Sequence, residues 1–409
     1  MAKSKTAANA ILYYESGQTL VNMAALTDSG DHLKFTSPNE NWSGYDGREP
    51  VVRPNGLATG GAITPAATLT NNYVDVAALT CFLAGVETEV AADADVECAR
   101  PDATYLLLTL ASGGYTNAVA SDIGKTVTGG TTGDTGVLVA YNNTTRQWLI
   151  DQTDSGDVFD DDDEALTIGT GTGAGSMSGV AVAVTHKILS ITVNSSGAVA
   201  VVAGYEGTAF SITRGDIGGP PFIPATSIEI GQVRYTAAAA AAVDEDEIFQ
   251  SEDVHQERYD SPVWTEDWAE GEVNFASALP LIHTGSVAKK VYAEYYTPIY
   301  SEVPNAADFV PAETTHSISS TQIYGGAVGA ASSSLGQGSF TAHLSTGVVD
   351  NLLKKKDKTL WFKFYPDRYR DEHILTQGKL GVSRQFPAGS SIIANCTISA
   401  SEASVDKES

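Results

Sequence analysis

The most regular stretch of the chain is Leu344–Ala400, which reads LSTGVVDNLLKKKDKTLWFKFYPDRYRDEHILTQGKLGVSRQFPAGSSIIANCTISA. Its pattern predicts one helix followed by three β-strands. The helix is expected over residues 345–356, with Ser345 as the N-cap and three lysines in the last turn, where the helix dipole favours cations. Five apolar residues at helical spacing would form its buried face: Leu344, Val348, Val349, Leu352 and Leu353.

The three strands follow from composition and alternation. Residues 360–365 are rich in aromatic side chains, which favour strands. A second strand is expected near 379–386 and ends at the turn Pro387-Ala388-Gly389. In residues 392–399 apolar and polar side chains alternate with period two, as in a half-buried strand. The whole stretch therefore looks like a packing unit that closes a β core.

Composition points to a mainly β protein. The chain has 409 residues, 39 of them glycine, and long amphipathic patterns are scarce. Its net charge of −26 argues against nucleic-acid binding through a broad basic face. Three cysteines without paired spacing (Cys81, Cys98 and Cys396) do not suggest a disulfide framework and favour folding in a reducing cytoplasm. We expect neither a signal peptide nor a membrane span.

The charge is unevenly distributed. Residues 1–250 hold 30 acidic and 11 basic side chains, whereas Leu344–Ala400 holds 9 basic and 5 acidic ones. A locally basic segment therefore lies in a strongly acidic chain. We expect its lysines to meet the acidic runs at 151–164 or 244–257 of a neighbouring subunit, because charge complementarity fixes register and specificity.

A change of composition divides the chain into three parts. Residues 105–185 are rich in Gly and Thr and contain a weak repeat at an offset of 39, in which 126–136 aligns with 165–175. We interpret this part as a small inserted β module, with 1–104 and 186–409 as the two parts of a larger core. Residues 1–104 would include an extended arm and loops.

Further strands are expected at 10–14, 136–141, 146–150, 227–235 and 288–300, and within 186–205. Residues 68–90 could hold strands or a short helix. Residues 323–337, rich in Gly, Ala and Ser, are expected to be flexible or loop-like.

Two motifs suggest ion or phosphate binding only weakly. Ile123-Gly124-Lys125-Thr126 resembles the end of a phosphate-binding loop, but the first glycine of that motif is missing, so a β-turn is the better interpretation. The acidic run could bind calcium, yet it lacks the EF-hand spacing and is better explained as a solvated loop. The run consists of Asp157, Asp160, Asp161, Asp162, Asp163 and Glu164.

No residue stands out as catalytic, cofactor-binding or metal-binding, and we expect no enzyme activity. His255 and Glu257 are spaced unlike metal ligands on a helix and are expected on the surface. One aromatic group could stack on sugars, although packing is the commoner role of such residues. It comprises Trp264, Trp268, Tyr292, Tyr295, Tyr296 and Tyr300.

Four segments together carry a family resemblance. Residues 345–353, 360–367, 378–383 and 386–389, with the final strand, resemble the closing part of the major tail proteins of long-tailed bacteriophages. Those proteins end with a helix, an aromatic strand running into a Pro-Asp turn, a strand of small residues, a Pro-containing turn and a last strand. The insert around Gly129–Gly136 is similar to modules of phage structural proteins.

The resemblance implies a fold and a function. The fold would be mainly β, a sandwich or barrel-like core with one flanking helix, and the inserted all-β module would face outward. Six copies would form a ring, and stacked rings would form a tail tube that contacts other tail proteins and lets DNA pass without specific binding. The protein would be made in the host cytoplasm and reside in the virion, with no cofactor and no membrane contact.

Two other classes remain open. The first is another virion component, such as a capsid decoration, capsid or fibre protein. The second is a carbohydrate-binding surface protein or glycan-degrading enzyme that uses Trp264 and Trp268.

Overall fold

The computed structural model describes residues 9–44, 49–101, 105–152, 159, 163–182, 185–207, 209–250, 259, 262–324 and 326–408. The fold is mainly β, and the helical elements within the described residues are short 3-10 turns, among them η2 (Ala120–Asp122), η3 (Glu245–Glu247) and η4 (Asn351–Lys355). The chain forms two compact units. Unit 1 comprises Met1–Arg53, Pro262–Leu279 and Lys290–Ser409, and unit 2 comprises Pro54–Ser261 and Pro280–Lys289. The division of the chain at 104/105 and 185/186, expected from composition, stays a prediction.

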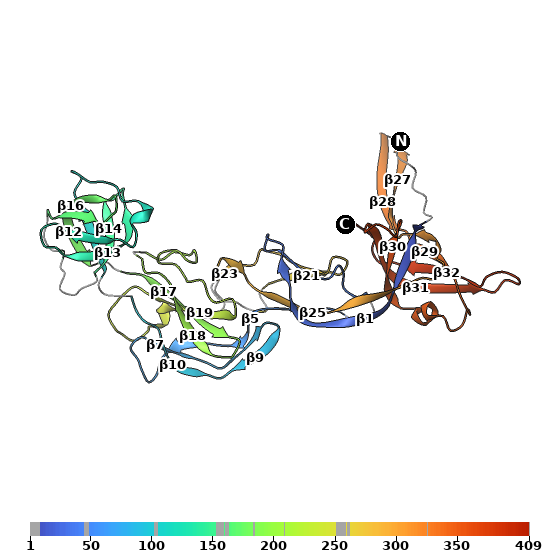
Figure 1. Cartoon of the computed structure of the whole chain (residues 1–409), viewed down its shortest axis with the longest axis horizontal. Coiled ribbons are helices and arrows are strands. Elements are labelled where there is room, and N and C mark those ends of the chain that lie inside the picture. The colour runs from blue at the N-terminus through green and yellow to red at the C-terminus, as the bar shows by residue number, and fades with distance from the viewer. Residues whose placement is uncertain are drawn as a thin grey trace. The chain divides into compact units, whose positions relative to one another are not determined.

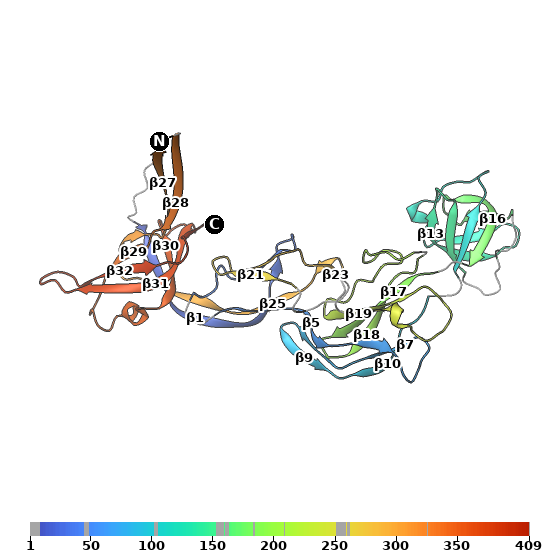
Figure 2. The same ribbon diagram turned by 180° about the vertical axis from the view of Figure 1, so that it is seen from behind.

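Unit 1 is built on a nine-stranded sheet in which the three strands of residues 344–400 are neighbours (Figures 1 and 2). In sheet order the strands are β26 (Ala307–Val310), β29 (Gly338–His343), β32 (Ile393–Ser399), β31 (His373–Gln385), β30 (Thr359–Tyr365), β1 (Ile11–Ala25), β25 (Val291–Glu302) and β4 (Val51–Pro54), with β33 (Val405–Lys407) beside β31.

Strand β31 changes its pairing partner along its length. It pairs with β30 through residues 374–379 and with β32 through residues 379–385. Gly378 lies next to this change of partner, and a Cβ atom there would stand 2.6 Å from Cγ2 of Ile398. Strands on both sides of β31 contribute to one core that includes Leu12, Phe340, Phe362, Leu380, Cys396 and Ile398.

The closing strands confirm the alternation in the sequence. Ala394, Cys396 and Ile398 are buried and Asn395, Thr397 and Ser399 are exposed. Strand β30 includes the whole aromatic segment 360–365. Strand β31 begins at His373, six residues before the strand expected at 379.

Residues 345–356 do not form the expected helix; only Asn351–Lys355 is helical, as the 3-10 turn η4. The carboxylate of Asp350 accepts hydrogen bonds from the backbone N–H groups of Ser345, Thr346 and Gly347, so this segment closes as a loop. Gly347 has φ +72°, which lies outside the helical region. Val348 and Val349, expected on the buried face, are exposed.

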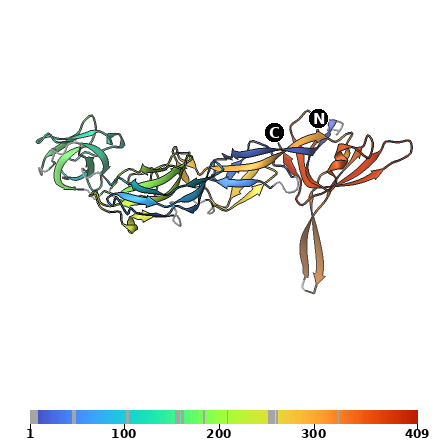
Figure 3. The ribbon, with the colours of Figure 1, turned by 90° about the horizontal axis from the view of Figure 1, so that it is seen from below.

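Two smaller elements complete unit 1. One is a four-stranded sheet in the order β2 (Thr27–Asp28), β3 (Lys34–Thr36), β22 (Glu272–Phe275), β21 (Trp264–Asp267). The other is the hairpin β27 (Thr314–Ile323) and β28 (Gly326–Leu335), which stands clear of the nine-stranded sheet in Figures 1 and 3. The expectation of a loop at 323–337 was wrong for most of this range, because every residue from 326 to 335 pairs with β27.

Unit 2 contains a core shared by three sheets. Their orders are β5 (Gly56–Gly60), β8 (Leu79–Leu83), β9 (Val86–Val90); β10 (Asp93–Glu97), β7 (Tyr73–Val76), β6 (Ile63–Pro65); and β18 (Val199–Ala203), β17 (Lys187–Asn194), β19 (Ser227–Tyr235), β20 (Ile248–Phe249). The core includes Leu57, Val74, Cys81, Ile191, Ile230 and Tyr235. A short pair, β23 (Leu281–His283) and β24 (Val287–Ala288), also belongs to this unit. Residues 68–90 therefore contribute strands and no helix.

The Gly/Thr-rich part forms a closed six-stranded barrel, seen in Figure 3. Around the barrel its strands are β11 (Tyr105–Leu110), β14 (Gln147–Asp151), β13 (Thr135–Asn142), β12 (Thr126–Gly129), β15 (Ala165–Ile168) and β16 (Ala174–Val182). The repeated segments are equivalent in the fold: each is a short strand, a Gly-rich loop and the start of the next strand. The two short strands, β12 and β15, pair antiparallel with each other.

Candidate functional site: the exposed hairpin and the basic loop

The hairpin β27–β28 is the most exposed regular element of unit 1. Its strands pair without a register shift over ten residue pairs, from Thr314 opposite Leu335 to Ile323 opposite Gly326. Every side chain in residues 314–320 and 331–334 is exposed. A two-stranded ribbon without a covering layer is marginally stable in water. The ribbon therefore has the properties of a segment that gains stability when another surface covers it.

The two strands carry no acidic residue, lysine or arginine. This is unusual in a chain in which 18% of residues are charged. Edge strands of monomeric proteins are commonly protected by charged side chains, which discourage strand pairing with other chains. The ribbon lacks that protection on both of its strands.

The base of the hairpin is fixed to the C-terminal segment. Ala312 N–H donates to Ser404 Oγ at 2.9 Å, and Ser404 N–H donates to Ala312 O at 2.7 Å. Gln337 accepts a hydrogen bond at 2.8 Å from the backbone N–H of Ala400. Thr376, buried in β31, shares a 2.7 Å hydrogen bond with the Ser404 hydroxyl. An exposed ribbon thus projects from a base that is tied to the nine-stranded sheet.

Residues 344–358, which we name the basic loop, form the second exposed feature of unit 1. Besides three backbone N–H groups, Asp350 accepts a hydrogen bond from the Thr346 hydroxyl at 3.0 Å. Desolvation would raise the pKa of Asp350, but the hydrogen bonds from Ser345, Thr346 and Gly347 outweigh it and lower the pKa. Arg384 of β31 donates to Gly347 O at 2.7 Å. The loop is therefore well ordered by polar contacts.

The basic loop presents apolar and cationic side chains together. Val348, Val349 and the nearby Phe386 are 60–68% exposed, and Lys354 and Lys356 are exposed. A groove of about 850 Å³ runs between this loop and the strands β1 and β25, with Tyr14, Glu302, Leu344 and Lys355 among its lining residues. Such a mixed surface fits contact with another protein better than a site for chemistry.

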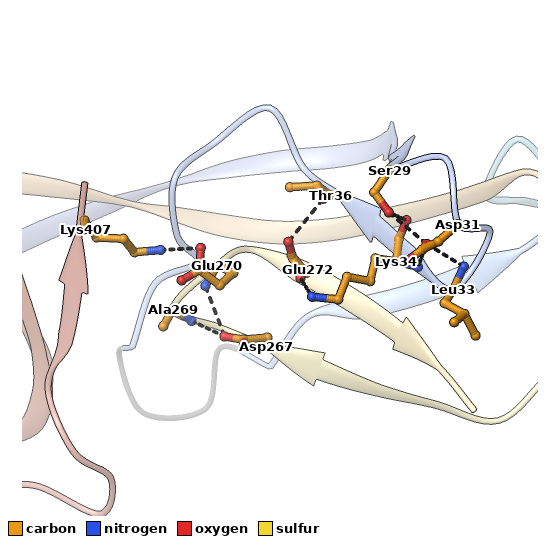
Figure 4. A network of polar contacts seen from close by, with 10 residues as sticks. All are labelled: Ser29, Asp31, Leu33, Lys34, Thr36, Asp267, Ala269, Glu270, Glu272 and Lys407. Carbon is orange, nitrogen blue, oxygen red and sulfur yellow. Dashed lines mark hydrogen bonds and ion pairs between the residues drawn. The ribbon is translucent and has the colours of Figure 1, made fainter. Parts of the chain in front are cut away.

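A network of polar contacts joins the small sheet of unit 1 to β33 (Figure 4). Glu272 contacts Lys34 at 3.8 Å and accepts a hydrogen bond from the Thr36 hydroxyl at 3.4 Å. At the β21–β22 turn, Glu270 forms an ion pair of 2.6 Å with Lys407 of β33. These charges stabilise the fold of unit 1 and leave no converging set of side chains suited to catalysis among those drawn.

The six aromatic residues singled out in the sequence are buried or partly buried. Tyr295 is buried and stacks on Trp42 with a centroid distance of 5.3 Å. Trp264 lies edge-on to Phe275 at 5.9 Å, and the Tyr300 hydroxyl bonds to Asn41 at 3.3 Å. These contacts are those of packing, and none of the six side chains forms an exposed platform for a sugar.

Most of the acidic run lies outside the described residues, as do His255 and Glu257. Of the run, Glu164 is buried and Asp163 is exposed. Within the described ranges, no group of three or more His, Cys, Asp or Glu side chains is arranged to hold a metal ion. In the second acidic run, Glu247 already pairs with Arg100 of the same unit at 3.1 Å, so part of that charge is neutralised internally.

Two buried carboxylates hold the Gly-rich loops of the barrel. Glu164, just before β15, accepts hydrogen bonds from Thr131 and Thr132, which follow β12. Asp122, just before β12, accepts hydrogen bonds from Thr172 and Gly173, which follow β15. An acidic residue that precedes each repeat therefore binds the Gly-rich loop of the other repeat.

The segment Ile123–Thr126, which resembles the end of a phosphate loop, is a turn with Gly124 at φ +84°. Lys125 pairs with Asp122 at 3.1 Å, so its ammonium group already has an anionic partner. The pKa of Asp122 is lowered, chiefly by the backbone hydrogen bond from Val119. The turn interpretation is confirmed.

Sequence reasoning recognised the lysines but missed the hairpin. A signal was present, since residues 314–323 contain Thr and Ile and the whole of 314–335 is free of Lys, Arg, Asp and Glu.

Among the described residues, no helix is long and apolar enough to cross a membrane. Compared with known protein families, curated proteins and solved structures, the chain shows no match.

Proposed function

We propose that the chain is a structural subunit of a phage virion, a tail tube protein that assembles into stacked, six-membered rings around a DNA conduit. The observation that carries the proposal is the uncharged, uncovered ribbon β27–β28 on a fixed base. The parts of the proposal that concern the ring, the tube and the passage of DNA come from the resemblance of the closing segments to major tail proteins.

Charge supports contact between like copies through this ribbon. Two chains of net charge −26 repel each other, so copies associate best where their surfaces carry no acidic groups. The same acidic excess would keep DNA from sticking to the wall of a conduit. A nucleic acid would find no lysine or arginine on the two strands of the ribbon.

The size of the ribbon favours a closed assembly over a simple dimer. Ten residue pairs make a ribbon ~34 Å long, and with a width of about 10 Å one face offers on the order of 340 Å². A stable interface buries roughly 800 Å² on each partner. One ribbon face is therefore too small by itself, whereas stacked rings repeat the contact at every subunit.

The test is electron microscopy and sedimentation of the purified chain beside a variant in which residues 315–334 are replaced by a short Gly-Ser turn. We expect tubes from the natural chain and single rings or monomers from the variant. Circular dichroism should show that the variant keeps the melting temperature of unit 1, since the removed residues are exposed. A natural chain that stays monomeric at every concentration and salt would contradict the proposal.

A further inference from the structure

His373, the first residue of β31, is a titratable side chain that is only 8% exposed. Its ring lies at a centroid distance of 4.9 Å from that of Tyr365 on β30. On the other side of β31 it lies opposite Lys407 of β33. Residues directly opposite each other in an antiparallel pair point to the same face. The imidazole is therefore flanked by β30 on one side and by the short strand β33 on the other.

The two ring nitrogens of His373 have different surroundings. Nδ1 lies 2.8 Å from the backbone carbonyl oxygen of Asp371, which can only accept a hydrogen bond, so Nδ1 carries the proton of the neutral ring. Nε2 is buried and has no hydrogen-bond partner among the described residues. A second proton would have to bind Nε2, where it would meet no acceptor. The paired structure therefore favours a neutral imidazole.

The charged groups nearest to His373 are already engaged with one another. On β30, Lys363 forms an ion pair with Glu40. On β33, Lys407 forms an ion pair of 2.6 Å with Glu270, which Figure 4 shows from close by. Neither carboxylate is therefore available as a counter-ion for an imidazolium without giving up its lysine.

The balance of these effects lowers the pKa of His373. Desolvation is the largest cause, and the two lysines lower the pKa further, whereas the hydrogen bond to Asp371 and the charge of Glu40 raise it. Arg370 and Glu372, in the turn before β31, are exposed to solvent, which screens their charges. A proton on His373 is thus unfavourable as long as β33 is in place.

Strand β33 (Val405–Lys407) is the part of the sheet whose release would hydrate His373. It is the shortest strand of the nine-stranded sheet, and within the described sheet it pairs with β31 alone, through three residue pairs. Its departure would take Lys407 away from the ring and admit water to Nε2. We propose that protonation of His373 releases β33 from β31, so that the sheet opens locally as the pH falls.

The direction of the pH dependence follows from the two states. In the released state His373 is hydrated and its pKa returns toward the usual value of about 6.5, whereas in the paired state it is lower. Below about pH 6.5 the released state therefore binds more protons, and the equilibrium shifts toward it. The ratio of released to paired strand should rise by up to about tenfold per pH unit, and should level off below the pKa of the paired state.

The test places a nitroxide spin label on β33 and follows its mobility by electron paramagnetic resonance. Asp406→Cys provides an exposed attachment point on β33, and Thr397→Cys provides an exposed one on β32 as a control. The native cysteines do not compete for the label at neutral pH, because buried, protonated thiols react poorly. Burial raises the pKa of the Cys81 thiol to about 11 and those of Cys98 and Cys396 to about 12.

From about pH 7.5 to about pH 4.5 we expect a mobile component to grow in the spectrum of the label at position 406, while the label at 397 stays unchanged. In His373→Asn, whose amide can still donate to the Asp371 carbonyl but does not titrate, the mobile component should change by less than about twofold. His343→Asn, at a partly buried histidine of β29, is the matched control and should keep the response of the natural chain.

Three outcomes would overturn the proposal. A label at 406 that stays immobile down to about pH 4.5 would show that β33 is not released. An equal response in His373→Asn would assign the release to another group, and a label at 397 that becomes mobile over the same range would indicate unfolding of the whole sheet. If His373→Asn does not fold, His373→Gln provides a second uncharged amide. The measurement concerns a single chain, so its result is independent of the proposed assembly.

Discussion

The carboxylate of Glu15 accepts a hydrogen bond at 3.2 Å from the backbone N–H of Trp361, at the point where β1 leaves β30. The two strands pair only as far as Tyr14 opposite Phe362, and β1 then continues beside β25 alone to Ala25. Glu15 is fully buried and also accepts hydrogen bonds from Ser43 and Gly44. The Glu15 side chain thus provides the acceptor for the Trp361 N–H group at the position where strand pairing with β1 ends.

The first prediction concerns this branch point. Glu15→Ala leaves buried N–H donors without an acceptor and should lower the free energy of unfolding by about 3 kcal/mol. Glu15→Gln keeps an acceptor for the N–H groups and can donate to the Ser43 hydroxyl, so its cost should stay within about 1 kcal/mol. Chemical denaturation followed by circular dichroism measures both. Equal losses in the two variants would show that the hydrogen bonds do not matter.

The same pair of variants gives a dependence on pH. Burial raises the pKa of Glu15, and the hydrogen bonds from Ser43, Trp361 and Gly44 offset only part of that rise. Between the unfolded and the raised folded pKa, the native state binds more protons than the unfolded state, so stability falls as pH rises through this window. Glu15→Gln should lack this slope; a slope unchanged from the natural chain would assign it to another group.

A second prediction concerns the exposed lysines of the basic loop. Changing Lys354 and Lys356 to Glu should abolish assembly at low salt, because the surface would repel the acidic neighbour it is proposed to meet. Changing both to Gln is the matched control and should weaken assembly less. Sedimentation at low and high salt is the measurement. Unchanged tube formation by the Glu variant at low salt would refute the electrostatic contact.

A third prediction concerns Arg100 in unit 2. Its guanidinium contacts both carboxylate oxygens of Glu247 at 3.1 Å and lies 4.1 Å from the ring centroid of Tyr235. Arg100→Ala should destabilise unit 2 by about 3 kcal/mol, because it leaves Glu247 and several carbonyl groups without their donor. Arg100→Lys should recover only part of this, since an ammonium cannot bind bidentately. Hydrogen exchange of the β19 amides reports the effect, and full recovery by Lys would exclude a bidentate role.

A fourth prediction compares Gly129, the last residue of β12, with Gly169, which follows the equivalent strand β15. A Cβ atom at Gly129 would stand 2.3 Å from Oε1 of Glu164, whereas one at Gly169 would meet only Thr126 O at 3.6 Å. Gly129→Ala should therefore cost about 1–3 kcal/mol by displacing the carboxylate, and Gly169→Ala should be close to neutral. Hydrogen exchange of the barrel amides separates the two. Equal effects would mean that the glycines act through chain entropy alone.

Alternation predicted the closing strands because their packing is local in sequence: every second side chain of β32 meets the same core. The helix prediction failed because helical spacing says nothing about Asp350, whose carboxylate competes for the amides that a helix would use. The hairpin was missed because Gly, Ala and Ser suit loops as well as strands. The reciprocal bonds of Asp122 and Glu164 join residues 32 to 51 positions apart, which a weak repeat cannot reveal.

The attachment of the hairpin has a mechanical consequence. Strand β28 runs into β29 across only Gly336 and Gln337, and β29 pairs with β32 over six consecutive residues. The hydrogen bonds of an antiparallel pair lie across the strands. A force that pulls on the ribbon would act along β29. It would strain all the hydrogen bonds between β29 and β32 at once, in shear, instead of breaking them one after another. The ribbon is therefore joined to the nine-stranded sheet through a connection suited to bearing force.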